Sequence, residues 1–336
     1  MEAPCNLTTG VCAKADAELY TRWLQFGALS PILRTHCSHC DRRIWSYAEP
    51  FYSAMAAALR LRRALQPFFY TAAANATASL ALAVHPLYHD FPSWPQAYQF
   101  SGQQYMLGLG LLVAPVAAPG GELPEAGLWL PPGLWLPWAC GASCAALQGP
   151  APLAPPPAAL GEYRVWAAPG TVLPTQPSTA GRAGSTLVWV LFGSGAGCGV
   201  GGGRGEVHED DGVTTSTAAL RTPLSFVSSA SASAASVSVS VSVGAAQGPG
   251  FPGAPAARRH VLQLRGFGGA PSSVACGGQG VPGVPPPPAG AAEAYNVTGW
   301  WAVPQALAQP WLPEGALVVV PQPAPVDTGI DCEVSW

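Results

Sequence analysis

Apolar residues recur at helical spacing in the first eighty positions of the chain and at strand spacing after them. Leu19, Trp23 and Phe26 stand at i, i+4 and i+7, which predicts a helix that buries this face. Asp16 fits the start of the helix because negative charge is favourable there, and Gly27 is a typical residue at a helix end. The first predicted element is therefore an amphipathic helix.

A short strand and a longer helix are predicted next. The strand covers Leu29–Arg34, and the helix covers about residues 51–74, where apolar side chains return at helical period. Arg60 and Arg63 fall on the outward face of that helix. Pro67 should kink the helix or start a new segment, because proline has no backbone N–H.

From Leu80 onward, glycine and proline separate short runs that predict strands. The segment WLPPGLW, residues 129–135, predicts a hairpin in which two tryptophan-bearing strands flank a Pro-Pro-Gly turn. The candidate strands of this middle region are Ala83–Tyr88, Tyr105–Val116, Trp129–Leu130, Trp135–Trp138 and Tyr163–Ala167.

A third region begins near Gly184 and contains the predicted strands Thr186–Phe192 and His260–Leu264. Between them the run SVSVSVSV (Ser236–Val243) alternates strictly, which predicts a strand with one buried face and a weakly charged, aggregation-prone edge. Stretches rich in alanine, glycine and proline predict loops or disordered insertions at about residues 145–159, 193–205, 228–235, 244–257 and 277–292.

The composition of the 336-residue chain argues against two classes of partner. Only 10% of the residues are charged and the net charge is −3, so nucleic acid is not indicated as a partner. No window reaches the roughly 18 uninterrupted apolar residues that a membrane helix needs. The 39 glycines and 37 prolines, concentrated in the second half, are typical of inserted loops.

The signals for a cellular compartment conflict. Sequons at Asn6, Asn75 and Asn296 are candidate N-glycosylation sites, and they favour a secreted or lumenal protein. The segment that begins at Met1 has neither the basic start nor the apolar core of a signal peptide. We therefore expect a protein of the secretory pathway or the extracellular space whose true N-terminus lies upstream, with a cytosolic chain as the alternative.

Nine cysteines leave at least one thiol unpaired if disulfides form. Cys5 with Cys12 and Cys140 with Cys144 are close enough in sequence to form local bridges. Buried or free thiols explain the same spacing equally well.

The most specific pattern is RWLQFGALSPILRTHCSHCDRRIW, residues 22–45. It places Arg34, Thr35 and His36 at the C-terminal end of a predicted strand that follows a helix, which is where α/β barrels build active sites. The order W-x-Q-F-G-x-x-S-P-I-x-R-T-H, followed by R-R-I-W, resembles the final βα unit of glycoside hydrolase family 31, the α-glucosidase family.

Further motifs extend this resemblance over most of residues 16–265. Arg63–Thr71 is similar to the family's last barrel helix, and His85–Pro92 to the strand that leaves the barrel, although the family usually has arginine where His85 stands. A second departure is at Leu109 and Gly110, where family members usually carry one or two acidic residues. Four more segments resemble the family's two β-domains: Gln104–Val116, Trp129–Trp138, Tyr163–Pro177 and Glu209–Ser216.

The resemblance implies a mixed α/β and β fold. Residues 1–80 would hold the last strand and helices of a (β/α)8 barrel, as a C-terminal remnant of that barrel. Two β-sandwich domains would follow, a proximal one in residues 81–177 and a distal one in residues 178–336, with long Gly/Pro/Ala-rich insertions.

The resemblance also implies retaining hydrolysis, which requires two carboxyl groups about 5–5.5 Å apart. In the family both stand on earlier barrel strands, the nucleophile in a W-x-D-M-N/S-E-type motif, and this chain has no such motif. We therefore predict that the chain contains no catalytic residue and is inactive alone. The acidic residues in and just beyond the barrel-like part lack a strand context: Glu2, Asp16, Glu18, Asp41, Glu49 and Asp90.

His36 is the residue that the resemblance implies as a ligand of substrate, through a hydrogen bond to the sugar in the first subsite. Its alternative is a structural histidine. Trp45 is a second candidate for substrate binding because aromatic faces suit sugar rings, with core packing as its alternative. Arg34 is predicted to support the barrel by pairing with an acid.

No metal and no cofactor is predicted. The segment His36-Cys37-Ser38-His39-Cys40 has C-x-x-C spacing, but structural zinc sites usually draw their ligands from two separated pairs. Asp210-Asp211-Gly212 offers too few oxygen atoms for calcium and is better explained as a hairpin turn.

The resemblance implies the C-terminal portion of an α-glucosidase-type glycoside hydrolase, from a truncated gene model or a split or degenerate gene. Its substrate would be an α-linked glucoside, bound when the rest of the barrel is present. The alternatives are a non-catalytic β-sandwich module that binds carbohydrate or stabilises a partner, a Pro/Gly-rich structural protein, and a zinc-binding module. No repeat of fixed period supports the structural protein.

Overall fold

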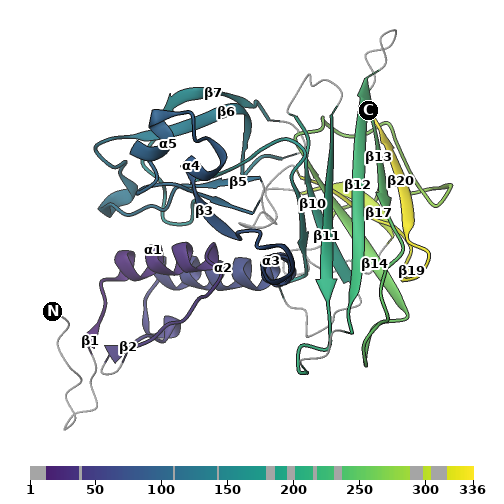
Figure 1. Cartoon of the computed structure of the whole chain (residues 1–336), viewed down its shortest axis with the longest axis horizontal. Coiled ribbons are helices and arrows are strands. Elements are labelled where there is room, and N and C mark those ends of the chain that lie inside the picture. Colours follow the sequence, from purple (N-terminus) through teal and green to yellow (C-terminus); the bar gives the residue numbers. More distant parts are fainter. Residues whose placement is uncertain are drawn as a thin grey trace.

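The structure is a computed structural model in which three parts follow one another along the chain (Figure 1). We call them the N-terminal helical unit (residues 13–79), the middle sheet unit (residues 84–167) and the C-terminal sandwich (residues 172–336). The residues that the structure describes are 13–37, 40–108, 110–141, 144–178, 186–194, 201–214, 218–230, 237–287, 298–303 and 316–336.

The N-terminal helical unit is built from α1 (Ala17–Ala28), α2 (Phe51–Ala64) and α3 (Gln66–Ser79). Asp16 caps α1, because its side chain accepts a hydrogen bond from the backbone N–H of Leu19. Between α2 and α3 stands Leu65, and Pro67 lies in the first turn of α3, where its missing N–H has no helical acceptor to lose. The predicted interruption at Pro67 is confirmed.

The buried face of α1 differs from the predicted one. Tyr20 and Leu24 pack in the core with α2, whereas Leu19, Trp23 and Phe26 lie exposed. Both sets recur at helical spacing, so the period alone did not decide which set faces inward.

The predicted strand Leu29–Arg34 is wrong. The chain turns at Leu29, and residues 32–37 have irregular backbone. A strand needs a neighbour that completes its hydrogen bonds. In the described part of this unit, the strands are the two-residue parallel pair β1 (Ala13–Lys14) and β2 (Cys40–Asp41), and neither pairs with residues 29–34.

The middle sheet unit contains one six-stranded sheet, with strand order β3-β4-β5-β8-β6-β7, where a proximal sandwich was expected. Two short helices, α4 and α5, contribute Leu87 and Ala97 to the core on one face of this sheet, together with Met106 and Trp129. The elements are β3 (Val84–Pro86), α4 (Leu87–Asp90), α5 (Pro95–Gln99), β4 (Tyr105–Leu107), β5 (Leu111–Val113), β6 (Leu128–Pro137), β7 (Leu147–Leu153) and β8 (Val165–Ala167).

The predicted hairpin at residues 129–135 is wrong, because these residues form part of the single strand β6. A register shift between Leu130 and Gly133 takes up the two prolines as a bulge. The partner strand β7 lies in the stretch 145–159, which was predicted to be a loop or a disordered insertion. A Cβ on Gly149 of β7 would lie 1.9 Å from the carbonyl oxygen of Pro131, so glycine permits the close approach of the two strands.

The C-terminal sandwich consists of two six-stranded sheets, β17-β18-β14-β10-β9 with β19 beside β14, and β11-β12-β13-β20-β15-β16. Trp189 and Leu262 of the first sheet share a core with Phe226 and Val241 of the second. The strands are β9 (Val172–Thr175), β10 (Thr186–Phe192), β11 (Gly201–Glu209), β12 (Leu220–Ala230), β13 (Val237–Val243), β14 (Ala257–Arg265), β15 (Ser273–Cys276), β16 (Gln279–Gly280), β17 (Gly299–Ala302), β18 (Leu317–Val320), β19 (Ala324–Pro325) and β20 (Ile330–Ser335).

The alternating run is confirmed as a strand with one buried face. In β13 the side chains of Val239, Val241 and Val243 are buried, and those of Ser240 and Ser242 are exposed. The strand lies between β12 and β20, so the expected free edge is wrong.

Several strands are longer than predicted and include residues that were predicted to be loops or disordered insertions. The predicted strands at residues 186–192 and 260–264 are confirmed within β10 and β14. β11, β12 and β16 extend into stretches that were expected to be insertions, because backbone pairing does not require bulky side chains. β9 pairs with β10, so residues 172–175 lie in the C-terminal sandwich although they fall within the range 81–177 expected for the proximal domain.

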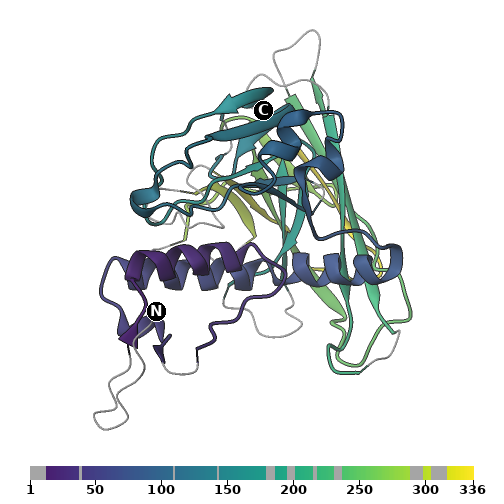
Figure 2. The same ribbon diagram turned by 60° about the vertical axis from the view of Figure 1, so that its left-hand side comes forward.

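The three parts are joined by buried contacts. α3 runs from the helical unit to the sandwich, where it contacts β9 and β11 (Figure 2). Arg265 at the end of β14 is fully buried; its guanidinium donates to the carbonyl of Trp138 at 3.1 Å and lies over the rings of Trp138 and Phe192. This arginine therefore links the middle sheet unit to the sandwich.

Three disulfides occur among the described residues. Cys140–Cys144 confirms one predicted local bridge, and Cys276–Cys332 joins β15 to β20, which sequence spacing did not indicate. Cys37 and Cys40 form the third. The predicted pair Cys5 and Cys12 lies outside the described residues. In that described part, no helix combines the length and apolar character needed to cross a bilayer.

Candidate functional site

A groove of about 730 Å³ lies between one face of α1 and the segment that follows it. Its wall is largely apolar and aromatic, with Trp23, Phe26 and Ile32 among the lining side chains. Arg34 and His36 lie along the same groove, and both are exposed to solvent. The groove therefore combines apolar surface with side chains that can hydrogen-bond a polar ligand.

The segment that carries these residues is held in place by two buried or half-buried side chains. Arg62 of α2 donates to the carbonyl oxygens of Ser30 and Pro31, at 2.6 Å each. Tyr105 of β4 donates to the carbonyl of Leu29 at 3.0 Å. Burial raises the pKa of Tyr105, so the hydroxyl keeps the proton that it donates.

The packing of Gly27 explains how the segment folds back on α1. A Cβ at position 27 would lie 3.1 Å from the Leu33 side chain, so the helix end has room for Leu33 because position 27 is glycine. Gly27 lies inside the last turn of α1, and the helix ends one residue later at Ala28. The predicted end of the helix was therefore correct to within two residues.

The structure brings together two of the three predicted site residues. Arg34 and His36 line the groove, whereas Trp45 lies in the 3-10 turn η1 (Ile44–Ser46), is 70% exposed and is not among the lining residues. Among the described residues, Arg34 has no ion pair. The roles assigned to these three side chains remain predictions.

Sequence reasoning missed Arg62 and Tyr105 as residues that position the groove. A signal for Arg62 was present, because an arginine on the otherwise apolar face of a predicted helix needs acceptors for its buried guanidinium. No comparable signal marked Tyr105, whose partner lies 76 residues away.

The described carboxylates of residues 13–90 all have structural partners. Asp16 caps α1, and Glu49 accepts a hydrogen bond from the Ser53 hydroxyl. Glu18 pairs with Arg22 and accepts from the backbone N–H of Gly120. Asp41 forms an ion pair with Arg43, and Asp90 is hydrogen-bonded to the rings of His85 and His89.

Asp41 is the acid nearest in sequence to the groove segment. Hydrogen bonds from Arg43 and Ser46 hold the pKa of Asp41 well below its ordinary value. A carboxyl with so low a pKa stays ionised at neutral pH and is unsuited to protonating a leaving group. The described residues of the groove therefore do not supply the acid–nucleophile pair of a retaining glycosidase.

Local hydrogen bonds from side chain to backbone stabilise the acidic turn at residues 210–212. Asp210 accepts from the backbone N–H of Gly212, and Asp211 accepts from the backbone N–H groups of Val213 and Thr214. The turn connects the antiparallel strands β11 and β12. The prediction of a hairpin turn is thus confirmed.

One of the three candidate glycosylation sites can be placed. Asn75 lies in α3, is partly exposed, and its side-chain oxygen accepts a hydrogen bond from Arg221 at 2.8 Å. Asn6 and Asn296 lie outside the described residues.

Two family models match consecutive parts of the chain. The TIM-barrel domain of glycosyl hydrolases family 31 matches residues 7–72, and the glycosyl hydrolase family 31 C-terminal domain matches residues 81–173. The first range contains all residues that line the groove, and the second contains the middle sheet unit.

Curated relatives are much longer than this chain. Alpha-glucosidase 2 of Bacillus thermoamyloliquefaciens is 30% identical over 129 residues, which are 38% of this chain and 16% of that protein. An alpha-xylosidase of Saccharolobus solfataricus is 32% identical over 106 residues, which are 32% of this chain and 14% of that protein. The chain spans less than one fifth of the length of either relative.

A solved structure shares the fold beyond the residues that the family models match. A family 31 dextranase of Flavobacterium johnsoniae, in complex with glucose, superposes with a TM-score of 0.72 at 21% identity. The alignment covers 95% of this chain and 37% of that one, so it extends through the C-terminal sandwich.

Proposed function

The chain belongs to glycoside hydrolase family 31, and we propose that it is the C-terminal part of a retaining glycoside hydrolase acting on α-glucosides. Relatives named as an alpha-glucosidase and an alpha-xylosidase support this class of activity. The proposed partner is therefore a carbohydrate that hydrolysis would cleave at an O-glycosyl bond.

The observation that carries the proposal is that the groove has the side chains for binding a sugar but no free carboxylate. Aromatic side chains and hydrogen-bond donors line it, while the described carboxylates of residues 13–90 form helix caps, ion pairs and hydrogen bonds. We assign substrate binding to His36, with Trp45 as a second contact and Arg34 as structural support. The two catalytic carboxylates would come from barrel strands outside these 336 residues, so the isolated chain would be inactive.

The exposed apolar surface supports a larger barrel around the N-terminal helical unit. Ile32 is 85% exposed, and Trp23 of α1 is 61% exposed beside it in the same groove. Large aromatic and aliphatic side chains gain free energy on burial, about 25 cal/mol for each Å² removed from water. Neighbouring barrel elements would cover this surface in the complete enzyme.

Three disulfides support a secretory or extracellular location for the proposed enzyme, since such bonds persist in oxidising compartments.

An activity assay on the purified full-length chain tests the proposal. With a chromogenic α-glucoside we expect no turnover above the buffer background, because no described carboxylate pair is free to act. Asp41→Asn and Asp90→Asn are the matched variants. Turnover that disappears in either variant would show that the chain carries its own catalytic acid and would overturn the proposal.

A non-catalytic carbohydrate-binding or structural module is the second candidate. It is favoured by one observation: the middle sheet unit and the sandwich enclose their cores, whereas residues 29–34 form no barrel strand. This module would bind an α-glucan as the isolated chain, and binding would survive His36→Ala. The enzyme proposal predicts instead that the isolated chain does not retain the glucan.

A further inference from the structure

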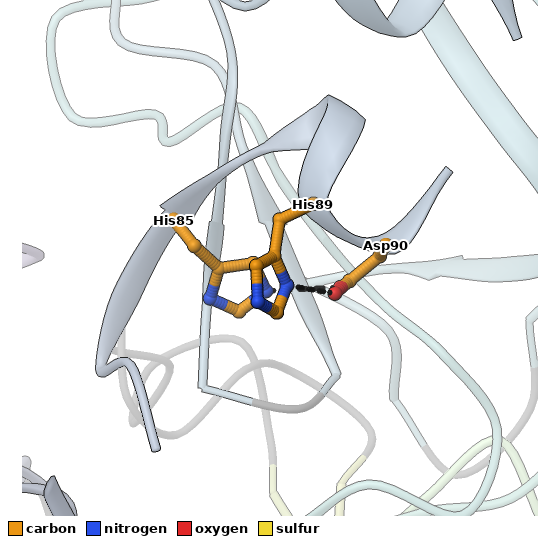
Figure 3. A group of neighbouring side chains, drawn as sticks. All are labelled: His85, His89 and Asp90. Atoms are coloured by element: carbon orange, nitrogen blue, oxygen red, sulfur yellow. Dashed lines mark hydrogen bonds and ion pairs between the residues drawn. The ribbon is translucent and has the colours of Figure 1, made fainter. Parts of the chain in front are cut away.

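Two histidines and one aspartate converge where the middle sheet unit begins. His85 lies on β3, and His89 and Asp90 lie on α4, which follows β3 directly. Figure 3 shows both imidazole rings turned toward the Asp90 carboxylate. Nε2 of His85 lies 2.9 Å from Oδ2 of Asp90, and Nδ1 of His89 lies 2.8 Å from Oδ1.

The cluster is built on a rigid base and open on one side. His85 is 3% exposed, and it is held by the register of β3 against β4, where it stands opposite Met106. His89 and Asp90 face solvent with side-chain exposures of 53% and 31%. The rings of the two histidines lie 4.7 Å apart, so the three polar groups surround one point at the surface.

Two imidazole nitrogens and one carboxylate oxygen are ligands that suit divalent transition-metal ions. Imidazole nitrogen suits zinc, copper and nickel, and zinc also accepts carboxylate oxygen. The Asp90 carboxylate lies between the two imidazoles, and each of its oxygens is within hydrogen-bond distance of one ring nitrogen.

The three side chains are close enough to share one ion. One ligand atom from each of the three residues lies within 4.8 Å of the other two. Tetrahedral zinc with bonds of about 2.0–2.1 Å needs ligand atoms about 3.4 Å apart. The two ring nitrogens contact different oxygens of Asp90, so binding of one ion requires the exposed His89 and Asp90 side chains to rotate.

We propose that His85, His89 and Asp90 form a surface site for a single Zn²⁺ ion, with water completing the coordination on the open side. The site is separate from the groove and does not depend on the proposed hydrolase activity. Metal binding through Nε2 of His85 moves that ring's proton to Nδ1, which is buried without a hydrogen-bond partner among the described residues. The affinity should therefore lie below that of sites whose histidines have a supporting acceptor.

Titration of the purified full-length chain with Zn²⁺, in buffer without reducing agent, tests the site by calorimetry. The expected result is one ion bound per chain, and loss of one ligand in His89→Ala should weaken binding by at least about 10- to 100-fold. Because His89 is exposed, this variant should fold; unfolding curves recorded without metal verify it. Asp90→Asn, which keeps the size of the side chain, should also weaken binding.

His36→Gln is the matched control, since it removes an exposed histidine from the His36–Cys40 segment. It should bind zinc as the wild-type chain does. The Co²⁺ form gives a second measurement: intense visible absorption of four-coordinate cobalt should appear with the wild-type chain and with His36→Gln, and be absent with His89→Ala. Lack of zinc uptake by the wild-type chain, unchanged uptake by His89→Ala, or loss of uptake in His36→Gln would each overturn the proposal.

Discussion

The C-terminal sandwich and the N-terminal helical unit use the same kinds of apolar side chain but enclose them to different degrees. Trp189 in the sandwich is completely buried, with both sheets contributing to its core, whereas Trp23 on α1 is 61% exposed. Two facing sheets close on each other within this chain, while α1 of the N-terminal unit leaves one apolar face uncovered. The apolar character of a side chain therefore does not by itself tell whether this chain buries it.

The largest contrast should come from truncating one tryptophan in each region. Trp189→Ala leaves a cavity in a closed core and should reduce the free energy of unfolding by about 3–5 kcal/mol. Trp23→Ala removes a side chain that is mainly in water and should change it by less than about 0.5 kcal/mol. Denaturant unfolding of both variants checks the pair, and equal losses would erase the proposed distinction between the two regions.

A pH effect should be specific to the sandwich core. Burial lowers the pKa of His260 to about 4, and the positive charge of Arg258 acts in the same direction. The neutral ring accepts a hydrogen bond from Nε1 of Trp189 at 3.1 Å. Its folded pKa is below the unfolded value of about 6.5, so the stability it contributes is present above pH 6.5 and is lost as the pH falls toward 4.

The expected loss from this one group is roughly 3 kcal/mol at pH 4 relative to pH 7. His260→Gln keeps an acceptor for Trp189 but cannot titrate, so its free energy of unfolding should fall less steeply than that of the wild-type chain. Measurements at both pH values test the difference, and parallel pH profiles for the two proteins would argue that His260 is not protonated on unfolding.

The smallest of the three expected effects comes from removing the hydrogen bonds between α1 and the middle sheet unit. Arg22 is buried, and its guanidinium donates to the carbonyl oxygens of Ala158 and Ala159 at 2.9 and 3.2 Å. Arg22→Met removes the donor to the Ala158 carbonyl, whereas the Ala159 carbonyl keeps the backbone N–H of Glu162, and the variant should cost about 1–3 kcal/mol. Hydrogen exchange should then rise in α1 first.

Arg60→Met is the control for the Arg22 variant, because it removes the charge of an exposed arginine on the neighbouring helix α2. It should leave exchange in α1 unchanged. If both variants accelerated exchange equally, the loss of a surface charge rather than of the buried hydrogen bonds would explain the result.

The groove shows what could be predicted of the candidate site. The order of Arg34 and His36 after a helix marked the segment from sequence, and both residues line the groove. The strand predicted beneath them is absent, because a strand needs pairing partners and none among the described residues lies beside it. Arg62 and Tyr105 hold the segment through contacts that span 31 to 76 residues, a range at which spacing carries no information.

Elements with a local signal could be predicted from residue order. The cap at Asp16, the break at Pro67 and the alternating face of β13 follow from backbone chemistry and side-chain period, and the family motifs follow from residue order. The absence of a W-x-D-M-type motif was equally visible.

Three other features depend on the packing of distant segments: which face of α1 is covered, the strand at residues 147–153, and the contact between His85 and Asp90. Each of these depends on which surface packs against which, and the free energy of burial is gained only when distant segments come together. A local pattern offers the possible surfaces, and the packing of the whole chain selects among them.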